Sequence, residues 1–207
     1  MKKITLIISI ILCFSIMHYS CKTKAIKNAH CVKVIKSSPS ASLLPASELK
    51  VIKSLFAGNR MDYANYQFYQ FDTDGLGFKH VKSYQFADNL KVFTEELIFH
   101  FNQRDSCYLI SGNRISSIGV GAKPLSNRDK VVELFIQKIA QEKSAMVVDA
   151  TILKGCFDVE LGLVGLENSK DKFIKAWKVK PTNKEYPFAY ISDENSEIIF
   201  YDNGVRY

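Results

Sequence analysis

The chain has 207 residues, which is enough for one large domain or two small ones. Hydrophobic residues make up 47% and charged residues 24% of it, a composition typical of globular proteins and unlike that of disordered ones. The formal net charge of +7 is modest and the basic residues are scattered, so nothing in the charge pattern indicates nucleic-acid binding.

Residues 1–20 have the pattern of a secretory signal. Lys2 and Lys3 precede an apolar run of about 14 residues, which is too short for a comfortable transmembrane helix. Ser20 stands directly before Cys21, and a small residue followed by Cys resembles a bacterial lipoprotein signal, in which the Cys becomes the lipidated first residue. We therefore predict lipidation at Cys21 and an extracytoplasmic location at the cell envelope. Simple secretion and an uncleaved anchor are the alternatives.

Residues 21–45 are rich in Lys, Ser and Ala and show no sustained period, which predicts a flexible tether. A short helix is expected over residues 46–56, where Leu49, Ile52 and Phe56 recur at helical spacing. Ser47 is the residue expected to cap its first turn.

Four strands are expected between residues 63 and 113. Residues 63–71 are rich in aromatic side chains, and residues 78–86 and 93–101 alternate with a period of two. Residues 107–110 form a short apolar run after a turn. This succession predicts an antiparallel meander.

The second half repeats the order of a helix followed by strands. Ser126, with Asp129 three residues later, is typical of a helix start, and residues 129–143 carry one apolar stripe. Strands are then expected at residues 145–153, 156–163, 173–180, 188–191 and 198–201. We predict an α+β fold of two tandem units, 46–123 and 124–207, each a helix packed on an antiparallel meander.

The cysteines give no sign of catalysis. With Cys13 removed with the signal and Cys21 lipidated, Cys31, Cys107 and Cys156 remain, an odd number that allows at most one internal disulfide. Cys107 and Cys156 lie in different predicted units and in apolar strands, so buried free thiols are the expected state.

The histidines and carboxylates do not form a recognisable active site either. His80 and His100 lie in neighbouring predicted strands and are expected to come close, where a structural hydrogen bond is favoured over metal ligation. Glu95 and Glu96 are adjacent and therefore point to opposite faces of a strand. The sequence contains neither a glycine-rich nucleotide motif nor His-Glu-x-x-His. We predict no enzymatic activity and no catalytic, cofactor or metal residues.

One stretch of the first half resembles a known family. Residues 77–86 read Gly-x-x-His-Val-Lys-x-Tyr-Gln-Phe, residues 92–100 read Val-Phe-Thr-Glu-Glu-Leu-Ile-Phe-His, and residues 111–113 read Ser-Gly-Asn. This order is similar to the fungalysin/thermolysin propeptide (FTP) motif, in which such strands belong to the prosequence of secreted zinc metallopeptidases.

The end of the chain resembles a PepSY domain, which is cystatin-like in fold. It reads Ala-Trp-Lys-Val at residues 176–179, then a Pro-containing loop, then Ile-Ser-Asp-x-x-Ser-Glu-Ile-Ile at residues 191–199. The family typically has Asp-Ala-x-Thr-Gly-Glu-Ile at that turn. The turn here is one residue shorter and lacks the Gly.

Together the two resemblances imply a non-catalytic, propeptide-like protein that binds a thermolysin-like zinc metallopeptidase in trans and inhibits or chaperones it. The candidate contact residues are Trp177 and the C-terminal Gly204, Val205, Arg206 and Tyr207. A core role for Trp177 and a frayed hairpin end for the tail are the plain structural alternatives. The alternative functions are a cell-envelope binding module for an unrelated ligand and a remnant of a longer protease precursor.

Overall fold

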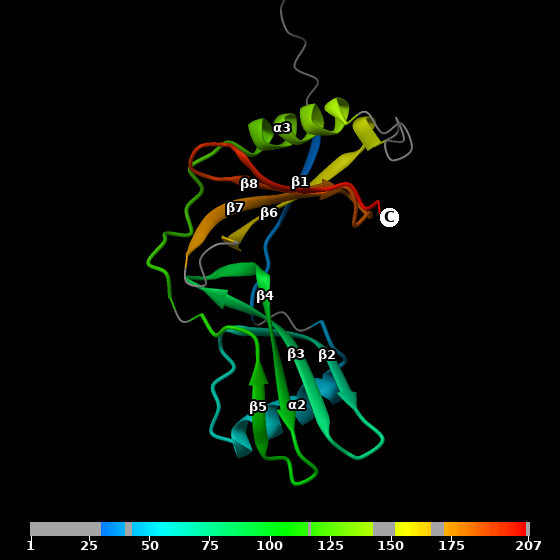
Figure 1. Cartoon of the computed structure of the whole chain (residues 1–207), viewed down its shortest axis with the longest axis vertical. Helices are drawn as coiled ribbons and strands as arrows, with labels where there is room; N and C mark the ends of the chain where they lie inside the picture. The colour runs from blue at the N-terminus through cyan, green and yellow to red at the C-terminus, as the bar shows by residue number, and fades with distance from the viewer. Residues whose placement is uncertain (1–29, 40–42, 116, 143–151, 167–171, 206–207) are drawn as a thin grey trace, which may run out of the picture.

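The computed structural model describes residues 30–39, 43–115, 117–142, 152–166 and 172–205 (Figure 1). Nine strands form one mixed sheet within these residues, accompanied by two α-helices and one short 3₁₀ turn. The strands are β1 (Cys31–Ile35), β2 (Tyr66–Thr73), β3 (Lys79–Ala87), β4 (Leu90–Phe101), β5 (Cys107–Ser111), β6 (Cys156–Gly165), β7 (Phe173–Pro181), β8 (Phe188–Ser192) and β9 (Ile198–Asp202). The helices are α2 (Ala46–Gly58), α3 (Arg128–Gln141) and the 3₁₀ turn η1 (Ile152–Lys154).

The strands run through the sheet in the order β2-β3-β4-β6-β7-β8-β9, with β5 paired to β4 and β1 paired to β6. All pairs are antiparallel except β4 with β6 and β1 with β6, which are parallel. The prediction of an α+β fold with two tandem helix-on-meander units is therefore wrong. The described part of the chain is mostly β, and the two short helices in it accompany a single continuous mixed sheet.

The two halves of the sheet meet where β4 runs beside β6. Lys91 lies opposite Gly162 and Val92 opposite Leu163 in this short parallel pairing. A Cβ at position 162 would lie 2.5 Å from the Lys91 carbonyl oxygen and 2.5 Å from the Phe93 ring. Only glycine fits such a close approach of two strands. Because the pairing joins residues 71 positions apart in sequence, strand periodicity gave no sign of it.

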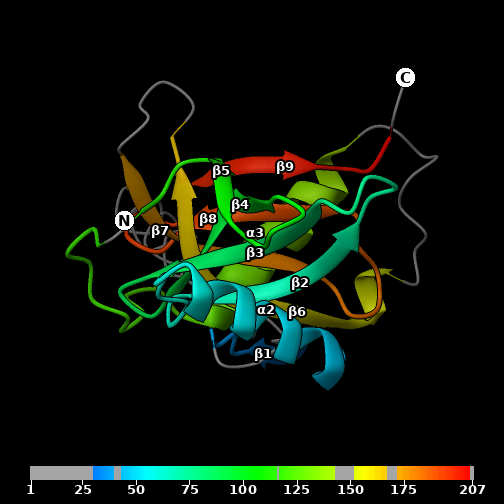
Figure 2. The ribbon, with the colours of Figure 1, turned by 90° about the horizontal axis from the view of Figure 1, so that it is seen from below.

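At one end of the sheet, α2 covers β2, β3 and β4 (Figures 1 and 2). Its apolar residues Ile52, Leu55 and Phe56 pack in a core with Val81 and Phe99. The helix was predicted correctly. Its expected Ser47 cap was not, because Pro45 precedes the first turn and no side chain caps it.

At the other end, α3 lies across β6, β7 and β8 (Figure 1). Val132 and Phe135 on its apolar stripe are buried against Phe157 and other strand residues. The N-cap lies one residue later than expected, because Asn127 rather than Ser126 accepts the hydrogen bond from the Asp129 backbone N–H, at 2.8 Å. Most of the strand expected at residues 145–153 lies outside the described residues.

The segment 31–35 is a strand and not part of a flexible tether. It pairs with β6 from Cys31 to Ile35, and Val32 and Val34 pack against the core beneath α3. Because these two apolar residues alternate over only five positions among Lys and Ser, the pattern was too short to recognise.

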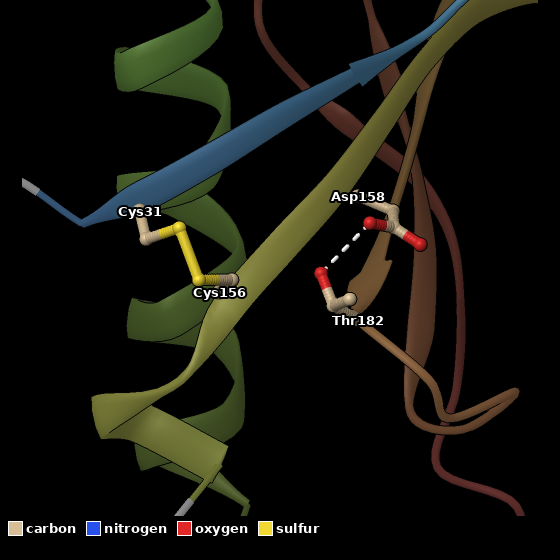
Figure 3. Close-up of a disulfide and its surroundings, with 4 residues drawn as sticks. All are labelled: Cys31, Cys156, Asp158 and Thr182. Atoms are coloured by element: carbon tan, nitrogen blue, oxygen red, sulfur yellow. Dashed lines mark hydrogen bonds between the residues drawn. A yellow bond between two sulfur atoms is a disulfide. The ribbon is translucent and has the colours of Figure 1, made fainter.

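A disulfide joins Cys31 to Cys156 at the start of this pairing (Figure 3). The expectation of a free thiol is therefore wrong for these two residues, and it holds for Cys107, which is half-buried. Thr182 reinforces the same end of β6, because its hydroxyl donates to Asp158 Oδ1 at 2.7 Å (Figure 3).

In the described part of the chain, neither helix has the length and apolar character needed to cross a bilayer.

Candidate functional site

The face of β3 and β4 that points away from α2 carries the most concentrated polar chemistry at that end of the sheet. Val81 and Phe99 point toward α2, so His80 and His100, their neighbours along the strands, point to the opposite face, which we call the open face. His80 and His100 lie directly opposite each other in the antiparallel pair. Their Nδ1 atoms are 2.8 Å apart, which confirms the expected approach of these two side chains.

The outer nitrogen of each ring also has a polar neighbour. His100 Nε2 lies 3.1 Å from Ser111 Oγ on β5, and His80 Nε2 lies 3.6 Å from Asp74 Oδ2 in the turn before β3. Asp74, His80, His100 and Ser111 therefore form a continuous polar chain across three strands and a turn, which we call the histidine relay.

The charge states along the relay follow from its surroundings. The backbone N–H of Phe78 donates to Asp74 and, with further hydrogen bonds, holds the pKa of that carboxyl below its ordinary value. Desolvation, followed by the nearby charge of His80, lowers the pKa of His100. At neutral pH Asp74 is thus a carboxylate and His100 a neutral imidazole. When the Ser111 hydroxyl donates to His100 Nε2 and the His100 Nδ1–H donates to His80 Nδ1, the Nε2–H of His80 faces the Asp74 carboxylate.

Exposed apolar side chains lie on β5 and in the turn before β3, next to the strands that carry the histidine relay. Leu76, Tyr108 and Leu109 are 71%, 53% and 50% exposed, and we call them the apolar patch. The Tyr108 ring lies 5.8 Å from that of Phe78 and 6.1 Å from that of His100. Exposed apolar groups gathered beside a sheet edge are typical of protein interaction sites.

A second cluster on the sheet joins β4, β7 and β8 at the opposite end. Lys178 Nζ lies 5.9, 5.1 and 6.0 Å from the ring centroids of Phe93, Phe188 and Tyr190. The Phe93 and Tyr190 rings are stacked, with centroids 5.4 Å apart. Desolvation lowers the pKa of Lys178, and these ring contacts stabilise its cation. Sequence reasoning missed the cluster because Phe93 joins it only through the β4–β6 pairing, which was not predicted.

The structure places Trp177 in the core. It is only 5% exposed, packs beneath α3, and donates from Nε1 to Asp193 Oδ1 at 2.8 Å. A side chain buried in this way is not available for contact with a partner, so Trp177 is no longer a candidate contact residue.

Asp193 is the residue that sequence reasoning overlooked. It is fully buried and also accepts from the Lys175 ammonium at 3.1 Å and from two backbone N–H groups of the segment before α3, those of Leu125 and Ser126, at 2.9 and 3.0 Å. Burial alone would raise the pKa of Asp193, but these hydrogen bonds outweigh it and hold the pKa below its ordinary value. Only its place in the Ile-Ser-Asp turn was visible in the sequence.

The remaining predicted site residues lie at the two ends of the chain. Gly204 and Val205 are half-buried, and a Cβ at position 204 would lie 2.6 Å from Tyr186 Cβ, so this part of the tail packs on the body. Arg206, Tyr207 and Cys21 lie outside the described residues. Within the part of the chain that the structure describes, no three or more His, Cys, Asp or Glu side chains converge on a common point.

Comparison with known proteins assigns a family motif to the open-face strands. The family model described as the fungalysin/thermolysin propeptide motif (FTP) matches residues 64–113, which contain β2 to β5, the histidine relay and the apolar patch. No curated protein matches the chain. The resemblance of residues 124–207 to a PepSY domain stays a prediction. The chain therefore contains an FTP motif, a non-catalytic region of thermolysin-like protease precursors, over about a quarter of its length.

Proposed function

We propose that the chain is a non-catalytic, propeptide-like protein that binds a thermolysin-like zinc metallopeptidase in trans and inhibits it or assists its folding. The FTP motif at residues 64–113 is the observation that carries the proposal. The motif falls on one contiguous set of strands, β2 to β5, with α2 packed behind them. Its open face presents the apolar patch beside an edge strand.

The physical route to binding is pairing with a sheet edge together with burial of exposed apolar side chains. Among the described strands, β5 pairs with β4 alone, which makes it an edge strand of the sheet. Tyr108 and Leu109 on this edge are half exposed or more. An extended segment of a metallopeptidase laid along β5 would bury both side chains.

The test uses the full chain purified in detergent and thermolysin-like metallopeptidases, including one from the same cell envelope. We expect slower peptide hydrolysis or a higher yield of refolded protease. The Leu109→Asp variant is expected to weaken the effect about tenfold or more, because it places a charge in the contact. Leu125→Asp is the matched control, since Leu125 is also exposed, at 71%, but lies just before α3.

Two outcomes would count against the proposal. One is the absence of inhibition and of refolding assistance for every protease tested. The other is an equal loss in both variants, which would move the contact away from the motif. In either case a cell-envelope binding module for another ligand becomes the better reading.

The proposed setting is the outer side of a bacterial membrane, with Cys21 as the lipid anchor. The Cys31–Cys156 disulfide supports an oxidising, extracytoplasmic location. Cys21→Ala is expected to move the protein from the membrane pellet to the soluble fraction, as measured by fractionation and immunoblotting. Cys107→Ser, which removes a thiol outside the signal region, should leave the distribution unchanged. Retention of Cys21→Ala in the pellet would argue for an uncleaved anchor.

A further inference from the structure

The inner nitrogens of the histidine relay are spaced like two ligands of one metal ion. Cis ligands at a right angle and about 2.0–2.1 Å from a metal are about 2.9 Å apart, and tetrahedral ligands about 3.3 Å apart. The His80 and His100 Nδ1 atoms are 2.8 Å apart. The pair is thus close to the cis spacing of a tetragonal centre, and both rings would have to turn so that their Nδ1 lone pairs converge on the ion.

The outer nitrogens have the partners that metal-binding histidines need. A ligating imidazole usually donates its other N–H to a carboxylate, a carbonyl or a hydroxyl, which fixes the ring and makes it a better ligand. Asp74 stands beside His80 Nε2, and Ser111 beside His100 Nε2. Both Nδ1 lone pairs become free when the His100 proton moves from Nδ1 to Nε2. The Nε2–H group then donates a hydrogen bond to Ser111 Oγ.

The surroundings admit a cation and attract it. The His80 side chain is 27% exposed and that of Asp74 is 39% exposed, so an ion can arrive from solvent. Asp72 lies opposite His80 on β2 and adds a second carboxylate near the pair. The nearest lysine in sequence, Lys79, is ion-paired with Asp105, while Lys82 lies one position further along the same face.

We propose that His80 and His100 form a two-histidine site for a divalent transition-metal ion, with Asp74 and Ser111 orienting the rings and the remaining coordination positions open to water. Imidazole nitrogens suit Cu²⁺, Ni²⁺ and Zn²⁺, and the cis spacing favours the tetragonal ions Cu²⁺ and Ni²⁺. The site goes beyond metallopeptidase binding and does not depend on it.

The first measurement is calorimetric titration of the detergent-purified full chain with NiCl₂ near neutral pH. We expect one saturable site, lost in His80→Gln and in His100→Gln and kept in His30→Gln. His30 is the matched control because its ring lies against Phe157 beneath α3, away from the pair. Unchanged affinity in either pair variant, or no binding by the parent chain, would overturn the proposal. The two histidines would then form a hydrogen bond and no metal site.

A second variant keeps the test informative if the glutamine variants fail to fold. Asp74→Asn retains both imidazoles and a side-chain oxygen for the N–H groups of Leu76 and Phe78, but it removes the carboxylate beside His80. We expect it to bind Ni²⁺ about tenfold more weakly. Equal affinity would contradict the orienting role of Asp74 and with it the proposed site.

A spectroscopic measurement distinguishes this site from weak surface binding. One equivalent of Cu²⁺ is expected to give an electron paramagnetic resonance spectrum of a tetragonal centre with two equatorial nitrogens. The experiment is done in the Cys107→Ser background, because the free thiol of Cys107 would reduce Cu²⁺. A spectrum showing one nitrogen or none would overturn the assignment.

Discussion

Asp193→Ala is expected to lower the free energy of unfolding by about 3–5 kcal/mol, because it removes one partner of a buried, hydrogen-bonded ion pair. The substitution removes the counter-charge of the Lys175 ammonium, which keeps only the Gly121 and Lys123 carbonyls. It also leaves the Trp177 indole N–H and two backbone N–H groups without their acceptor. Each lost partner leaves a desolvated donor that water reaches poorly. Urea denaturation followed by Trp177 fluorescence measures the loss directly.

Glu194→Ala is the matched control, since it removes an exposed carboxylate from the same turn. Its effect should stay within about 0.5 kcal/mol, as for most surface substitutions. Similar losses in the two variants would show that Asp193 does not hold the turn in place.

The same carboxylate gives the folded state a defined acid sensitivity. The pKa of Asp193 is lower in the folded protein than the value of about 3.9 for an unfolded chain, so the unfolded chain binds this proton more readily. The stability due to Asp193 is therefore complete above that value and is lost as pH falls through the folded pKa. Asp193→Asn should remove this part of the pH dependence.

Reduction of the Cys31–Cys156 disulfide, or Cys31→Ser, is expected to cost about 2–5 kcal/mol. The bond joins residues 125 positions apart and so closes a loop that contains most of the folded body. Opening it gives the unfolded chain more conformations and frees β1 to separate from β6. The melting temperature with and without dithiothreitol measures the effect.

Cys107→Ser is the control for side effects of the reducing agent and for the loss of a thiol. Cys107 is the unpaired, half-buried cysteine of the described residues. Its melting temperature should still fall on reduction, as that of the parent chain does. A parent chain that melts at the same temperature in both conditions would contradict a stabilising role for the bond.

Local patterns in the sequence predicted most of the described elements but not how they assemble. The alternation around Val81 and Phe99 identified β3 and β4, and the stripe through Val132 and Phe135 identified α3. Period and turn chemistry are properties of neighbouring residues, so they identify single elements and hairpins. The β4–β6 and β1–β6 pairings join distant segments in parallel, and no neighbouring residues encode them.

The candidate site divides in the same way. The approach of His80 and His100 followed from a simple hairpin and was predicted. The roles of Asp74 and Ser111 depend on a turn and on a third strand, and Asp193 depends on a loop 67 residues away. Such contacts require the tertiary structure.

The strand β1 also limits how far the protein can stand from a membrane. A tether running to residue 45 would allow a wide excursion, but the disulfide at Cys31 ends it ten residues after Cys21. Ten residues span at most about 35 Å. With a lipid on Cys21, the α3 end would stay beside the bilayer and the strands of the FTP motif would project from the opposite end (Figure 1). Any protease it meets would then be one that comes close to the same membrane.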